Sequence, residues 1–191
     1  MKTRSLAAAV FLLTASLAAQ TFLVKDITTG SGSAGSSPSY FTLVGSKAFF
    51  VADVTGYGQE LWITDGITST HMVKDIYPGS TSSNPAWFVA IGSNIFFTAT
   101  SPQFGTELWM SDGTEAGTVM VKDIRPGTDG SLPLFLANVD GTLFLVANDG
   151  VSGSELWKSD GTAAGTVLVE DIVPGSGSSA PSIIASFNGD A

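Results

Sequence analysis

Cysteine is absent from this sequence, and histidine and basic residues are scarce. Without cysteine the chain can form neither a disulfide nor a thiolate site. Its one histidine, His71, leaves little material for Ser/His/Asp or Cys/His catalysis, so we interpret His71 as a structural or surface residue. The 191 residues carry 8 Lys and Arg against 17 Asp and Glu, a formal net charge of −9. Such an acidic chain lacks the positive surface that nucleic acid and anionic lipid require, and we expect no nucleic-acid partner.

A long hydrophobic run is also lacking, apart from one short stretch at the N-terminus. Lys2 and Arg4 precede an apolar run over residues 5–17, which is too short to span a bilayer. Small residues follow where a signal peptidase recognises them, so we predict a Sec-type signal peptide over residues 1–19. The alternative, a membrane anchor, would need a longer apolar segment. We expect the rest of the chain to be secreted, to an extracellular or cell-surface location, without membrane insertion; loss of the two cations takes the formal charge from −9 to −11.

Outside the predicted signal peptide the sequence also lacks the 3.6-residue periodicity of helices. Instead, groups of identical residues recur with a period of about 48 residues. The shared columns are Glu-Leu-Trp at 60–62, 107–109 and 155–157, Asp-Gly at 65–66, 112–113 and 160–161, Val-Lys/Glu-Asp-Ile at 24–27, 73–76, 121–124 and 169–172, and Pro at 38, 85, 133 and 181. Independent columns with one period indicate a tandem repeat. The predicted organisation is a single repeat region over 20–191, with complete units at about 38–76, 85–124 and 133–172 and partial units at 21–27 and 181–191.

Each complete unit has the pattern of four short strands. The first strand follows the proline, as at 39–44 and 86–91, and the second is an apolar run, as at 48–52 and 143–147. The third contains Glu-Leu-Trp, and the fourth covers 118–124 and its equivalents. Continuous apolar runs favour strands that are covered on both faces. The Asp-Gly between the third and fourth strands supplies the positive φ of a tight turn.

Four antiparallel strands in 40–50 residues are typical of a propeller blade. We predict an all-β, β-propeller-like array of four-stranded antiparallel blades, with about three complete blades and partial strands at both ends, and so an incomplete propeller. In this interpretation residues 21–27 form a lone fourth strand and residues 181–187 a lone first strand. A β-solenoid is the alternative fold.

If the fold is an incomplete propeller, we expect one of two arrangements. Either the chain is a fragment of a longer repeat protein, or copies of it self-associate to complete the ring.

Residues 107–114, Glu-Leu-Trp-Met-Ser-Asp-Gly-Thr, resemble the bacterial ELWxxDGT repeat family, sometimes described as hyalin-like. The resemblance covers nearly the whole chain after the signal peptide. The first copy departs from it at Ile67, where the later copies have Thr114 and Thr162. The resemblance implies a large, exported, multi-repeat surface protein.

A second resemblance concerns Ala147, Gly153 and Trp157, which are spaced as in the tryptophan-docking motif of quinoprotein-type propellers. It implies that Trp157 and its counterparts pack between adjacent blades, with the indole N–H bonded to backbone. No quinone is implied, because nothing else resembles that cofactor site. The residues interpreted as structural are Trp62, Trp109, Trp157, Asp65, Asp112 and Asp160.

The acidic columns are the candidate ligand chemistry. Calcium binds six to eight oxygens, which loops of an exported acidic protein can supply, and Asp53 and Asp149 are the candidate metal ligands. No loop has the spacing of an EF-hand calcium loop. The alternative is that the Asp of each Asp-Gly caps a turn and that the strand acids bond to backbone or to Lys. Calcium is the one cofactor we consider.

The acids also bear on catalysis. Catalytic carboxylates of glycoside hydrolases are singular residues, whereas these acids recur in register. We therefore predict no catalytic residue, no cofactor-binding residue and no enzyme activity. The expected function is that of an exported non-enzymatic repeat module, in cell-surface or extracellular binding, adhesion or structure, with an unidentified protein or glycan ligand. The alternative is a propeller-type secreted hydrolase that acts on polysaccharide.

Overall fold

The computed structural model describes residues 25–27 and 35–182, and every regular element in these ranges is a β-strand. The predicted signal peptide, 1–19, lies outside them. The strands are β1 (Ser39–Val44), β2 (Lys47–Val54), β3 (Gly58–Thr64), β4 (Thr70–Lys74), β5 (Ala86–Ile91), β6 (Asn94–Ser101), β7 (Gly105–Ser111), β8 (Val119–Lys122), β9 (Leu134–Val139), β10 (Thr142–Asn148), β11 (Ser154–Ser159) and β12 (Val167–Glu170). No helix in the ranges given is long and apolar enough to cross a membrane. The all-β prediction is confirmed.

The strands form three four-stranded antiparallel sheets, and each sheet falls within one repeat unit. Sheet 1 holds β1–β4, sheet 2 holds β5–β8 and sheet 3 holds β9–β12, and within each sheet the strands are neighbours in chain order. Such a meander needs only short turns. The turn between β5 and β6 contains Gly92, whose φ of 61° favours glycine.

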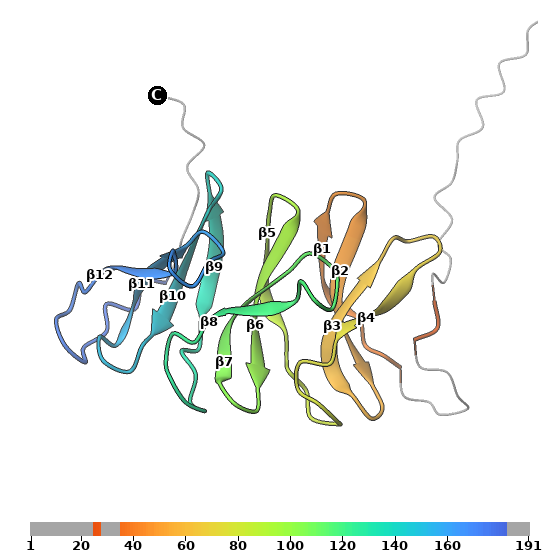
Figure 1. Ribbon diagram of the computed structural model, residues 1–191, viewed down its shortest axis with the longest axis horizontal. Coiled ribbons are helices and arrows are strands. Elements are labelled where there is room, and N and C mark those ends of the chain that lie inside the picture. Colours follow the sequence, from red (N-terminus) through yellow and green to blue (C-terminus); the bar gives the residue numbers. More distant parts are fainter. Residues whose placement is uncertain (1–24, 28–34, 183–191) are drawn as a thin grey trace, which may run out of the picture.

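The three sheets stand side by side in chain order, with the first strands β1, β5 and β9 next to one another (Figure 1). Over the described part of the chain they form an open array and do not close into a ring.

Apolar side chains on both faces of the inner strands hold neighbouring sheets together. Within each Glu-Leu-Trp the Leu and the Trp point to opposite faces, as successive residues of a strand must. Leu61 and Trp109 belong to the cluster between sheets 1 and 2, whereas Leu108 and Trp157 belong to the cluster between sheets 2 and 3. The prediction that the apolar runs are covered on both faces is confirmed for β2 and β6, whose central residues are buried without interruption.

The fourth strands are shorter than predicted. We expected a strand over 118–124, but β8 covers only Val119–Lys122. The backbone N–H of Ile124 donates to the carboxylate of Glu107 instead of to a neighbouring strand, and the backbone N–H of Thr118 donates to the carbonyl of Glu115 in the preceding turn. The chain therefore leaves the sheet early because its backbone groups have other partners.

The short segment 25–27 lies against part of the face of sheet 1 that points away from sheet 2. Ile27 packs against Phe50 and Trp62, and Nζ of Lys25 donates to the carbonyl of Thr70 at 3.0 Å. The lysines of the same column make the same contact between sheets: Lys74 to the Thr118 carbonyl at 2.9 Å and Lys122 to the Thr166 carbonyl at 2.7 Å. Residues 25–27 thus lie beside sheet 1 as the corresponding residues of one sheet lie beside the next.

The outer face of sheet 3 is open to solvent. Val169 is 41% exposed and Ile172 is 57% exposed, whereas the corresponding Val121 and Ile124 of sheet 2 are buried against sheet 3.

The two lone strands that we predicted at the ends of the repeat region fall mostly outside the described residues. Lys25 to Ile27, the described part of the first, is not in a strand, and residues 21–24 lie outside. Pro181 and Ser182 are likewise not in a strand, and residues 183–187 lie outside.

Substitution of Gly105 by alanine tests how closely the backbone packs at the start of β7. The φ of Gly105 is 62°, and a Cβ added there would overlap the backbone carbonyl of Thr128. Gly92 has nearly the same φ, 61°, but open space around it. We expect Gly92→Ala to lower the free energy of unfolding by about 1 kcal/mol, the backbone cost alone, and Gly105→Ala by at least about 2 kcal/mol more. Urea unfolding of both variants measures this, and equal losses would contradict the close packing at Gly105.

Candidate binding site along the first strands

The glutamate of each Glu-Leu-Trp is fully buried and binds the loop that leads to the next sheet. Oε1 of Glu107 accepts from the backbone N–H groups of Arg125 and Ser131, at 3.1 and 2.9 Å. Its Oε2 accepts from the N–H of Ile124 at 3.3 Å and from the Ser131 hydroxyl at 2.5 Å. The serines in the same place in the other repeats are Ser83, bonded to Glu60, and Ser179, bonded to Glu155. These acids bond to backbone and serine, so their oxygens are occupied by the scaffold.

Burial perturbs two of these carboxyl groups. It raises the pKa of Glu60 to about 7, against the opposing hydrogen bonds from the Ser83 hydroxyl and three backbone N–H groups. The pKa of Glu107 is raised for the same reason. The pKa of Glu155 is lowered, first by the hydrogen bond from the Ser179 hydroxyl. Sheet 3 has an open outer face, so less protein surrounds Glu155 and desolvation does not prevail there.

The aspartates of the Asp-Gly column bond within their own turns. Oδ1 of Asp65 accepts from the backbone N–H groups of Ile67, Thr68 and Ser69, at 2.9, 2.8 and 2.9 Å, and these bonds hold the pKa of Asp65 well below its usual range. Asp112 and Asp160 accept instead from the backbone and the hydroxyl of Thr114 and Thr162. The first turn differs because Ile67 stands where the later copies have threonine. Hydrogen bonds of this kind are those of a turn cap.

The calcium candidates Asp53 and Asp149 lie in different sheets. Asp53 is exposed near the end of β2, and Asp149 lies between β10 and β11, where its Oδ1 accepts from the N–H groups of Val151 and Ser152. Residues 25–27 and 35–182 contain no group of three or more acidic or histidine side chains that could hold a metal. His71 is exposed on β4, with its Nδ1 3.2 Å from the Ser69 hydroxyl.

The tryptophans of the Glu-Leu-Trp column are buried, and our prediction for their indole groups is wrong in one respect. Trp109 packs among Val73 and Ile76 of the preceding sheet, as expected of a residue between sheets. However, Nε1 of Trp62, Trp109 and Trp157 is buried without a hydrogen-bond partner in the described structure. Over Trp157 the charged Nζ of Lys122 lies 5.8 Å from the ring centroid, which adds a cation–π contact.

A row of aromatic residues follows the proline column. Tyr40, Trp87 and Phe135, which we call the aromatic row, each stand two residues after a proline in a first strand. Their φ values are 57°, 57° and 53°, in the left-handed region that bulky residues avoid. The register of each first strand shifts at or beside this place, as in a β-bulge. Because the same unfavourable φ occurs at the equivalent position of all three first strands, we interpret it as a conserved property of the repeat and not as an isolated irregularity.

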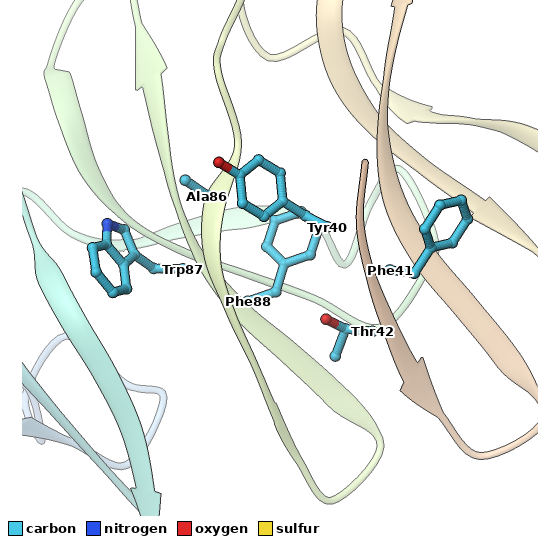
Figure 2. Close-up of a pocket in the computed structure, with 6 residues that line it drawn as sticks. All are labelled: Tyr40, Phe41, Thr42, Ala86, Trp87 and Phe88. Carbon is cyan, nitrogen blue, oxygen red and sulfur yellow. The ribbon is translucent and has the colours of Figure 1, made fainter. Parts of the chain in front are cut away.

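Two residues of the aromatic row, Tyr40 and Trp87, border an open hollow of about 460 Å³ between β1 and β5. The hollow is lined by Tyr40, Phe41, Thr42, Ala86, Trp87 and Phe88 (Figure 2). Tyr40 is 62% exposed and Trp87 is 39% exposed. Exposed aromatic groups that gather at one place are typical of binding surfaces.

Ring packing explains why the hollow lies between β1 and β5. The Tyr40 ring leans on Phe88, with ring centroids 6.3 Å apart. The Trp87 ring packs on Phe135 of the next sheet, with centroids 5.2 Å apart and a tilt of 60°. Trp87 therefore turns toward sheet 3 and leaves space on its other side, next to Tyr40.

Sequence reasoning missed the aromatic row. The signal was present, because an aromatic residue stands two positions after Pro38, Pro85 and Pro133. A first strand reads as an apolar segment, and such a segment is normally assigned to the core. Tyr40 and Trp87 are exposed at left-handed positions, and no residue type in the sequence predicts a left-handed tyrosine or tryptophan.

No family model, curated protein or solved structure matches this chain.

Substitution Glu60→Gln tests the buried carboxyl group. The folded pKa of about 7 exceeds the unfolded value of 4.5, so the folded state holds an additional proton between these values. The group then contributes stability that is complete below pH 4.5 and is lost as the pH rises through about 7. From pH 5 to pH 8 we expect the free energy of unfolding of the native chain to fall by about 1–2 kcal/mol relative to the variant, after allowance for solvent screening.

Urea unfolding of both proteins at the two pH values measures this difference. Glu155→Gln is the control: the folded pKa of Glu155 lies below its unfolded value, so its contribution is lost only at lower pH and should differ little between pH 5 and pH 8. A difference between the native chain and Glu60→Gln that stays constant from pH 5 to pH 8 would show that the buried carboxyl does not titrate in this range.

Proposed function

We propose that this chain is an exported, non-enzymatic repeat module of the β-propeller kind that binds a ligand through the aromatic row. The observation that carries the proposal is the exposure of Tyr40 and Trp87 at equivalent left-handed positions of neighbouring first strands. Left-handed backbone costs an L residue about 1–2 kcal/mol and persists where surrounding structure maintains it, commonly at functional sites.

The state of the acids supports a binding role over hydrolysis. A hydrolase needs carboxyl groups that are free to exchange protons with a substrate. Glu60 and Glu107 receive hydrogen bonds from loop backbone and serine, and the Asp65 carboxylate is occupied by its own turn. These contacts use the acids as structural acceptors.

The β-propeller architecture is proposed from the sheets and from how they meet. Three antiparallel meanders of four strands lie side by side in chain order, and a lysine of each fourth strand reaches the next sheet. A propeller repeats such units radially. The exposure of Val169 and Ile172 on the outer face of sheet 3 supports the proposal that a further sheet packs there, from a longer repeat protein or from a second copy.

The proposed location and family rest on the sequence. The signal peptide predicted over residues 1–19 supports export, and the Glu-Leu-Trp/Asp-Gly-Thr columns support membership of the ELWxxDGT repeat family. Both favour a cell-surface or extracellular role in adhesion.

The double substitution Tyr40→Ala/Trp87→Ala tests the binding role. We expect the purified native chain to be retained by a component of a broad glycan array or by a surface-protein extract, and we expect the double variant to lose that retention. Tyr57→Ala is the matched control, because Tyr57 is 46% exposed but lies in the turn between β2 and β3, away from the aromatic row. Thermal unfolding shows whether the double variant is folded. Empty results from both probes, or equal retention of the folded double variant, would count decisively against the proposal.

A further inference from the structure

We propose that the hollow between β1 and β5 is a carbohydrate-binding site, and that it takes a hexose unit of a neutral polysaccharide. This inference rests on the proposed binding function and assigns its ligand class. The hollow, about 460 Å³, falls within the range of small-molecule pockets, about 300–1,000 Å³.

The lining offers a sugar both kinds of contact that it needs. A hexose ring has a face of C–H groups and an edge of hydroxyl groups, so it pairs with a flat apolar surface that carries hydrogen-bonding groups. Tyr40 and Trp87 come from neighbouring strands and border the same hollow (Figure 2). Each is an apolar ring with one polar group, the phenol hydroxyl or the indole N–H, and the Thr42 hydroxyl adds a third.

Charge narrows the ligand class to neutral sugars. None of the six lining residues is Lys, Arg or His, so the hollow has no cationic partner for a carboxylate, sulfate or phosphate group. The chain as a whole is acidic, with a formal net charge of −9. An anionic polysaccharide would therefore be repelled at long range without a compensating contact in the hollow.

The lining also disfavours an extended peptide. A peptide that binds beside a sheet gains most of its affinity from hydrogen bonds to an unpaired strand edge. The bulge at Tyr40 and the corresponding one at Trp87 break the regular edge of β1 and β5 at the hollow. Ring faces with a few polar groups remain, and these suit a sugar better than a backbone.

The packing of the aromatic row predicts the number of sites. Between β5 and β9 the Trp87 and Phe135 rings contact each other, whereas between β1 and β5 the corresponding space is open. We therefore expect one sugar site for each copy of the region 35–182.

Trp87 supplies a spectroscopic signal that is specific to this site. Of the four tryptophans it alone is substantially exposed, at 39%, while Trp62, Trp109 and Trp157 are buried. A sugar ring stacked in the hollow should therefore protect Trp87 from acrylamide quenching and shift its emission, and the other three indoles should not respond.

The experiment titrates the purified chain with soluble neutral polysaccharides (a β-glucan, a galactan and a mannan) and follows acrylamide quenching and affinity electrophoresis. We expect at least one of them to bind at one site per chain and to lower the quenching of Trp87. Trp87→Ala should weaken binding about ten-fold or more, as expected for loss of one stacked ring. Trp87→Phe keeps a ring and should retain most of the affinity, and the control Tyr57→Ala should bind as the native chain does.

Two comparison ligands separate this inference from the proposed function. If alginate, an anionic polysaccharide, or an aromatic-rich peptide protects Trp87 and the neutral polysaccharides do not, the carbohydrate assignment is wrong while the binding role of the aromatic row stands. If no ligand in the titration, on the glycan array or in the surface extract engages the row, both are wrong. Neutral sugar binding that survives unchanged in folded Trp87→Ala would place the sugar elsewhere and overturn the assignment.

Discussion

The carboxylate of Glu107 is buried in the protein and receives four hydrogen bonds, all from the loop that carries the chain from sheet 2 to sheet 3. A buried carboxylate is costly unless its oxygens are satisfied, so the loop must keep one conformation for the sheet to remain folded. Glu60 and Glu155 impose the same constraint on the loops that follow sheets 1 and 3. The hydrogen bonds to the glutamate therefore fix the place where the next first strand begins. They also fix the position of the aromatic residue in that strand.

Packing between the sheets follows from that placement. Once the loop is fixed, Leu108 faces the following sheet and Trp109 faces the preceding one, so a single dipeptide contributes to two clusters. A lysine then crosses to a threonine carbonyl of the next sheet. The left-handed backbone of Tyr40 and of Trp87 lies at a bulge near the start of a first strand, and their rings are exposed to solvent. Polar scaffold contacts are thus repeated in every unit, while the exposed rings differ from unit to unit.

The repeat made the sheets predictable, because apolar runs and Asp-Gly turns report local backbone preference. The first strands at 39–44 and 86–91 have the predicted bounds for this reason. The end of β8 was not predictable, since the N–H of Ile124 bonds to a side chain seventeen residues away in sequence. The indole N–H groups were also predicted wrongly, because the spacing of a motif gives the position of Trp109 in its strand but not whether a backbone carbonyl comes within reach of its Nε1. The exposure of the aromatic row was not predicted, because it depends on the left-handed φ of Tyr40 and Trp87, which the sequence does not indicate.

Hydrogen exchange of the Ile124 and Ser131 amides in the native chain and in Glu107→Gln tests the central role of the buried glutamate most directly. Glu115→Gln, at an exposed position in the turn before β8, is the control. The account predicts that Glu107→Gln speeds exchange of both amides ten-fold or more and also exposes the amides of β9, while those of β6 and β7 keep their protection. Unchanged protection of Ile124 and Ser131 in a folded Glu107→Gln variant would contradict it.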